Sequence, residues 1–333
     1  MTPFWIIEWD RGVAEVQPLG GMLGPVWFTT PNGQRVQPFF MPPWQGEPGA
    51  EALCGLLRGL RGEWPCVPFG MERDKPIPGW EGAKAGIGDD ELHGYAANHD
   101  WQLIGSGPGW IEIGIEYPRD HPIRWLRRKI VGRSGAAILD LQLEIEAATE
   151  IDLGFALHPT FRLPHQAGMA QIDVAGMTGG LVFPAQLDAT GCATPGAWFE
   201  KLEKVPGIHA PPVDFSRQPF AAPNEDLLQV QATGGCVRLT NTEEGWVAQI
   251  DFDPELFPTV VLWVTNKGWT GYPWAKRTCA LGIEPARAAF DLGQPVSGDP
   301  DNPMARAGIP TSINMQAGGR LRTDYALSVE DLV

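Results

Sequence analysis

Two segments in the middle of the chain alternate strictly between apolar and polar residues. In "WIEIGIEY" (110–117), Ile111, Ile113 and Ile115 alternate with Glu112, Gly114 and Glu116, and "LDLQLEIE" (139–146) repeats the pattern with leucine and isoleucine. A period of two places every apolar side chain on the same face of a strand. We therefore predict two strands, each with one buried and one wet face.

The same alternation, between connectors rich in turn residues, predicts further strands along the chain. They fall in "EIDLGFALHPTF" (150–161), "WVAQIDFD" (246–253), "TVVLWVTN" (259–266) and "YALSVE" (325–330). Strands with one wet face are typical of antiparallel sheets. One segment differs, because the leucines of "AEALCGLLRGLRG" (50–62) fall at helical spacing and predict a short helix.

The amino-acid composition, together with the alternation, indicates the fold class. The chain has 333 residues, of which 41 are glycine and 32 are proline, and 43% are hydrophobic. So much glycine and proline suits many strands and turns and leaves little room for long helices. We predict an all-β protein, a large antiparallel sandwich with few short helices, formed as one domain over residues 1–333.

Charge and cysteine content exclude several classes of partner. The formal net charge of −15 disfavours nucleic acids and anionic membranes, which need a basic surface. Five scattered cysteines without a CxxC pair predict free thiols and neither a disulfide framework nor a structural metal site. No segment has the length of a membrane span or the pattern of a signal peptide. We expect a cytoplasmic monomer or homodimer.

Three short motifs place a titratable group where a strand meets a loop. They are "LHGYA" with His93, "LHPTFRL" with His158 and "ALGIEPARA" with Glu284. A following proline restricts the backbone at His158 and Glu284. Each group alone has a structural explanation, but an imidazole and a carboxylate together supply the acid and the base that proton transfer at neutral pH requires.

In their order and spacing, these three motifs resemble the signatures of the aldose 1-epimerase (galactose mutarotase-like) family. The tryptophan-bearing "LWVTNKGW" before the last motif also agrees. The resemblance extends over roughly residues 15 to 330. It implies a β-supersandwich that interconverts the α and β anomers of a sugar without a cofactor.

The resemblance also implies roles for the three residues. Glu284 would be the base that takes the proton of the anomeric hydroxyl, and His158 the acid that protonates the ring oxygen. His93 would donate a hydrogen bond near that oxygen. We expect Glu284 to be ionised and His158 protonated through mutual attraction, and we expect the small residues Gly94, Ala96 and Ala97 to leave room for a pyranose.

Two positions depart from the family pattern. Ala97 stands where many relatives carry an arginine that belongs to a phosphate site in hexose-6-phosphate mutarotases, which favours an unphosphorylated sugar. An upstream substrate-binding arginine has its counterpart in "FGMERDKP", where Arg73 is the candidate. Trp263, Trp269 and Asp251 are further candidates for sugar binding, since indole faces stack on the C–H faces of sugars.

Two other functions remain open. A carbohydrate-binding or regulatory protein could keep the cleft without turnover, and the missing arginines favour it. A lyase or hydrolase on the same fold is the other alternative, and hydrolysis would need a second carboxylate close to Glu284. The separation of His158 and Glu284 is the observation that decides whether an acid–base pair exists.

Overall fold

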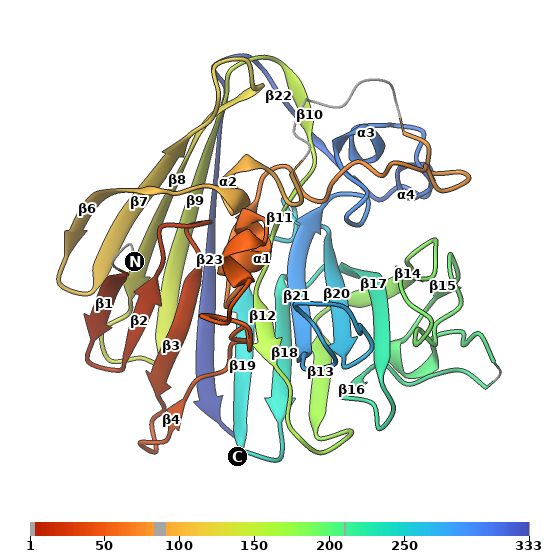
Figure 1. Ribbon diagram of the computed structural model, residues 1–333, viewed down its shortest axis with the longest axis horizontal. Coiled ribbons are helices and arrows are strands. Elements are labelled where there is room, and N and C mark those ends of the chain that lie inside the picture. The colour runs from red at the N-terminus through yellow and green to blue at the C-terminus, as the bar shows by residue number, and fades with distance from the viewer. Residues whose placement is uncertain (1–3, 83–90, 210, 333) are drawn as a thin grey trace.

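The structure, a computed structural model, describes residues 4–82, 91–209 and 211–332. Its largest element is a nine-stranded antiparallel sheet that contains most of the predicted alternating strands (Figure 1). In spatial order its strands are β16 (Arg217–Gln218), β13 (Ala170–Val174), β18 (Cys236–Asn241), β19 (Trp246–Asp251), β23 (Arg320–Asp331), β9 (Ile138–Ala147), β8 (Ile123–Gly132), β7 (Trp110–Glu116) and β6 (Gln102–Gly107).

An eight-stranded antiparallel sheet forms the second layer. Its order is β15 (Trp198–Phe199), β14 (Met177–Val182), β17 (Asn224–Ala232), β20 (Thr259–Asn266), β21 (Cys279–Arg287), β11 (Phe155–Leu157) and β5 (Pro65–Cys66), with β12 (Thr160–Arg162) also paired to β21. Smaller sheets join β1 (Trp5–Trp9), β2 (Gly12–Val16), β3 (Leu23–Thr29) and β4 (Arg35–Val36), and β10 (Ile151–Leu153) with β22 (Ile313–Met315).

The helices are short. They are α1 (Gly55–Gly59), α2 (Tyr95–Asn98), α3 (Gln294–Ser297) and α4 (Pro303–Arg306), with 3₁₀ turns at Ala50–Ala52 and Leu202–Lys204. The all-β antiparallel sandwich predicted from the sequence is therefore confirmed, as is the short helix in the leucine-rich segment. None of the helices in the described part of the chain is long and apolar enough to cross a membrane.

Alternation along the strands of the eight-stranded sheet sorts their side chains into two cores. Leu262 and Ile283 belong to the core shared with the nine-stranded sheet. Val261 and Trp263 point to the opposite face and pack with Leu56 of α1. Both faces of β20 are buried, so this sheet has a covered outer face, and the candidate site lies there.

The predicted strand over 150–161 is broken into β10, β11 and β12. Gly154 separates β10, which pairs with β22, from β11, which pairs with β5 and β21. His158 and Pro159 interrupt the pairing again, because proline has no backbone N–H for a ladder bond. His158 faces the outer side of the sheet, as Ala156 does two residues earlier.

Candidate active site

Strand register brings His158 and Glu284 together from positions far apart in the sequence. Thr160 of β12 pairs with Gly282 of β21, so His158 lies near Glu284. The backbone N–H of His158 donates to the carbonyl of Trp64 at 2.8 Å, and Ile283 N–H donates to Pro159 at 2.9 Å. Backbone hydrogen bonds thus fix both sides of the pair.

The two side chains face each other within one cavity. His158 Nε2 lies 3.3 Å from Glu284 Oε1, and the two side chains are 6% and 2% exposed. His158 Nδ1 is 3.1 Å from the hydroxyl of Thr160. The indole of Trp64 stacks on the imidazole of His158 with the ring centres 4.1 Å apart. The two groups are close enough to act on adjacent atoms of one bound molecule.

The charge state of the pair differs from the expectation drawn from the sequence. Burial raises the pKa of Glu284 well above its ordinary value, and the nearby Asp291 adds to this effect. Burial lowers the pKa of His158 well below 6.5, and His93 adds to it. The expectation of an ionised resting pair is therefore wrong, because the surrounding side chains are too apolar to solvate two charges. A neutral histidine beside a protonated glutamate is favoured instead.

His93 presents a hydrogen-bond donor to the same cavity. The backbone N–H of Gly70 donates to His93 Nδ1 at 3.2 Å, so the ring proton of the neutral imidazole is on Nε2. Burial lowers the pKa of His93 to about 3, which keeps it neutral. Its ring stacks on Phe69 at 4.9 Å and meets the ring of His158 edge-on at 5.1 Å. His93 also has a positive φ of 62°, a conformation uncommon outside glycine.

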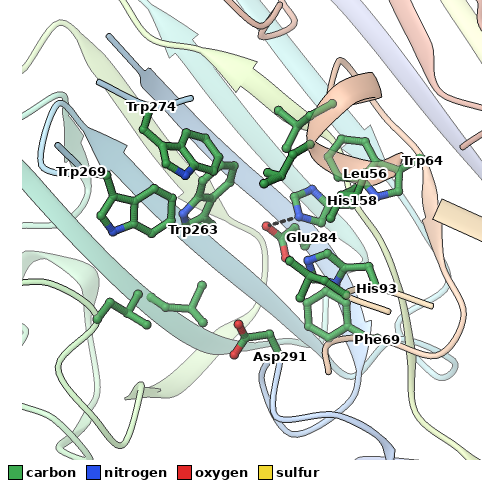
Figure 2. A pocket seen from close by; sticks show the side chains of 15 residues that line it. Leu56, Trp64, Phe69, His93, His158, Trp263, Trp269, Trp274, Glu284 and Asp291 are labelled. Atoms are coloured by element: carbon green, nitrogen blue, oxygen red, sulfur yellow. Dashed lines mark ion pairs between the residues drawn. The ribbon is translucent and has the colours of Figure 1, made fainter. Parts of the chain in front are cut away.

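Tryptophans form the opposite wall of the cavity (Figure 2). Trp263, from β20, packs against Trp269 and Trp274, which are carried by the following loop. The cavity has a volume of about 130 Å³, which is enough for several water molecules. Its lining also includes a set of leucines, namely Leu56, Leu57, Leu60, Leu92, Leu187 and Leu227.

No protein-family model and no curated protein matches the chain. Solved structures do match it along nearly its whole length. A candidate aldose 1-epimerase from Escherichia coli K12 is 14% identical, with 99% of each chain covered and a TM-score of 0.66. A galactose mutarotase related enzyme from Lactobacillus acidophilus is 13% identical, covering 99% of this chain and 98% of its own, with a TM-score of 0.63.

A third solved structure agrees with these two. An aldose epimerase homologue from C. elegans is 13% identical, with full coverage of both chains and a TM-score of 0.64. The chain has the galactose mutarotase-like fold. At these identities the comparison establishes the backbone architecture, and the chemistry has to be argued from the cavity itself.

Within this mutarotase-like fold, the sequence-predicted residues separate into two groups. Glu284, His158, His93, Trp263 and Trp269 all line the cavity. Arg73 does not line it but reaches it indirectly: its guanidinium lies 3.5 Å from Asp291, which does line the cavity, and stacks over the ring of Phe183.

Asp251 lies elsewhere. It is on β19 of the nine-stranded sheet, where its carboxylate accepts a hydrogen bond from Gln249 at 2.8 Å. The alternation in "WVAQIDFD" marks Asp251 as part of the wet face of that strand. The structure therefore does not bring Asp251 to the cavity.

The small residues after His93 have a packing role, and the expectation that they make room for a pyranose is wrong. Ala96 and Ala97 are fully buried in the two cores. A Cβ atom on Gly94 would overlap the backbone of Val67, and its φ of 83° favours glycine. These small residues allow α2 and the residue before it to pack closely against neighbouring segments such as Val67.

Sequence reasoning missed Asp291, Trp274 and Leu227, which all line the cavity. Asp291 follows β21 in a stretch with no motif, and Trp274 was one tryptophan among many. Leu227 lies opposite Trp263 in the register of β17 and β20, which only the strand pairing reveals.

Proposed function

We propose that this protein is an aldose 1-epimerase that interconverts the α and β anomers of an unphosphorylated sugar by acid–base ring opening. The observation that carries the proposal is the 3.3 Å separation of His158 Nε2 and Glu284 Oε1 inside one cavity. Apart from this contact with His158, Glu284 Oε1 is buried without a hydrogen-bond partner among the described residues. An unpartnered buried oxygen is costly unless a ligand uses it.

The reaction consists of two proton transfers around one bond cleavage. The Glu284 carboxylate takes the proton of the anomeric hydroxyl, the bond between C1 and the ring oxygen breaks, and His158 gives its proton to that oxygen. Rotation about the C1–C2 bond presents the other face of the aldehyde. The same steps in reverse then close the ring to the other anomer.

The apolar surroundings influence these steps in a definite direction. The resting neutral pair must first move one proton from Glu284 to His158, at a cost set by burial. Ring opening then discharges both groups and returns the pair to the neutral form that burial favours. The stacked indole of Trp64 stabilises the transient imidazolium, and the Nε2–H of His93 is available to the ring oxygen while negative charge grows there.

NMR saturation transfer between the two anomeric protons tests the proposal. We expect faster exchange for at least one sugar in a panel of glucose, galactose, xylose, arabinose and rhamnose. Glu284→Gln and His158→Asn should each lose this acceleration by 10²-fold or more, as expected for the loss of a general acid or base. Asp251→Asn is the matched control and should retain it, because Asp251 lies on the other sheet.

A non-catalytic sugar-binding protein is the alternative from a different class. It predicts binding of a sugar without acceleration of exchange in the wild type. A hydrolase is a second enzymatic candidate, and one observation favours it: Asp291 supplies the additional carboxylate in the cavity. Its contact with Arg73 argues that Asp291 positions that arginine. Release of nitrophenol from aryl glycosides would support hydrolysis, and its absence beside rapid anomer exchange would exclude it.

A further inference from the structure

The cavity lining contains two histidines and two carboxylates among apolar side chains, and Trp64 and Phe69 stack on the two histidines. His93, His158 and Glu284 lie together on one side (Figure 2), and Asp291 lies below them. The rest of the lining consists of leucine, tryptophan and phenylalanine side chains. This arrangement follows from the fold, because α1 and the loop after β20 place their apolar side chains over the outer face of the eight-stranded sheet.

Leucine is the informative residue in this lining. Tryptophan suits any sugar, since it has an apolar face and an N–H donor. A leucine offers no hydrogen bond, and Leu56, Leu60 and Leu227 are 1%, 3% and 6% exposed. A sugar hydroxyl held against these side chains loses its water and gains no hydrogen-bond partner, which weakens binding.

Few polar atoms of the lining are available to a ligand. Glu284 Oε1 and Asp291 Oδ1 are buried without a hydrogen-bond partner among the described residues, and the basic groups beside them are His158 and Arg73 at 3.3 and 3.5 Å. The Nε2–H of His93 and the indole N–H groups of the tryptophan wall are the remaining donors. A fully hydroxylated hexose has more hydroxyls than these groups can bind, so some of its hydroxyls would lie against the leucines.

We propose that the substrate of this site is a deoxygenated cyclic hemiacetal, a sugar-like ring that keeps its anomeric hydroxyl but lacks hydroxyls on the part that faces the leucines. This inference rests on the proposed function, since the ring-opening chemistry is unchanged. The inference concerns the ring positions of the substrate that the acid–base pair does not contact. Hydrocarbon at those positions gains burial energy where a hydroxyl would lose hydrogen bonds.

A series of substrates of decreasing polarity tests this inference. Anomer exchange is measured for glucose, 6-deoxyglucose and 2-hydroxy-6-methyltetrahydropyran, which keeps only the anomeric hydroxyl. Each kcat/KM is divided by the spontaneous rate constant, which removes differences in intrinsic reactivity. We expect this ratio to rise at least tenfold from the first substrate to the last. A ratio that stays level or falls while glucose is turned over would overturn the inference and leave the epimerase intact.

Binding separates the inference from the proposed function. The tryptophans of the cavity report occupancy through their fluorescence, so the affinities of Glu284→Gln for the same three compounds can be measured without turnover. Tighter binding of the deoxygenated ring supports the inference even if no compound is turned over, an outcome that would refute only the epimerase. Equal or weaker binding of that ring would refute the inference.

A pair of variants at Leu227 provides the reciprocal test. Leu227→Asn adds a hydrogen-bonding group to the apolar wall, and Leu227→Met is the apolar control of similar volume. We expect Leu227→Asn to shift the preference toward glucose by tenfold or more and Leu227→Met to leave it unchanged. If both variants keep the wild-type preference, the leucine wall does not select the substrate.

Discussion

Glu225 holds the loop that carries two of the cavity tryptophans, and its removal should affect both stability and substrate binding. Glu225 Oε1 accepts hydrogen bonds from the backbone N–H groups of Gly268 and Trp269 at 2.8 and 3.3 Å, and from the Thr265 hydroxyl at 3.1 Å. The loop packs so closely that a Cβ atom on Gly268 would overlap the Glu225 side chain. Trp269 is therefore placed by a carboxyl group outside the cavity.

The size of the effect follows from the two backbone donors. Glu225→Ala leaves both amides without their acceptor, at about 1–3 kcal/mol each if no water replaces it, or roughly 2–6 kcal/mol in total. Glu225→Gln keeps an acceptor oxygen and should cost much less. In the exchange assay, Glu225→Ala should raise KM more than it lowers kcat, because Trp269 moves while the acid–base pair stays in place.

The pH dependence gives a sharper test. Burial raises the pKa of Glu225 from 4.5 to about 7, and the charge of Asp188 adds to this effect. The folded protein therefore holds this proton more tightly than the unfolded chain. Its stabilising effect is complete below pH 4.5 and is lost as the pH rises through 7. At about 1.4 kcal/mol per pKa unit, the free energy of unfolding should fall by up to about 2–3 kcal/mol between pH 5 and 8.

Urea unfolding of the wild type and Glu225→Gln at both pH values measures this loss. Other titrating groups cancel in the comparison, because glutamine alone lacks the proton in question. The wild type should lose stability relative to Glu225→Gln as the pH rises. Parallel pH dependences for the two proteins would refute the reasoning.

Three further predictions concern the acid–base pair and the core. A Cβ atom at Gly282 would overlap Glu284 Oε1, so Gly282→Ala should reduce anomer exchange at least tenfold while the melting temperature changes little; full activity would contradict this. Because the pKa of Glu284 is raised and that of His158 lowered, the pair keeps one proton over a wide range, and kcat/KM should show no inflection near pH 6.5, the ordinary pKa of histidine. Arg128 and Glu63 form a fully buried ion pair, so Arg128→Met should lower the free energy of unfolding by about 3–5 kcal/mol, and a loss below 1 kcal/mol in urea unfolding would be inconsistent with it.

The antiparallel sandwich could be predicted because alternation is local. The sequence of each strand by itself indicates which of its side chains are buried. The pairing of strands is not local. The motifs at His158 and Glu284 could be identified one by one, but their 3.3 Å contact depends on the register of β12 against β21. Family resemblance supplied that pairing, and the structure supplies its geometry.

The remaining features of the site could not be predicted because they depend on what surrounds each residue. Asp251 and Trp263 both lie on alternating strands, and only the layer arrangement separates the wet face of β19 from the covered face of β20. The charge state of the pair was predicted in the wrong direction for the same reason. Attraction between His158 and Glu284 can be anticipated from the motifs, whereas the apolar wall that opposes their ionisation is assembled from distant segments.

The most direct test of the account is the anomer exchange rate of the double variant Glu284→Gln with His158→Asn, beside the two single variants. Residues that act as one unit lose nearly all their contribution when either is removed. The double variant should therefore exchange no more than a few-fold more slowly than the slower single variant. Losses that multiply would contradict the claim that these two side chains act as one acid–base pair on one ring.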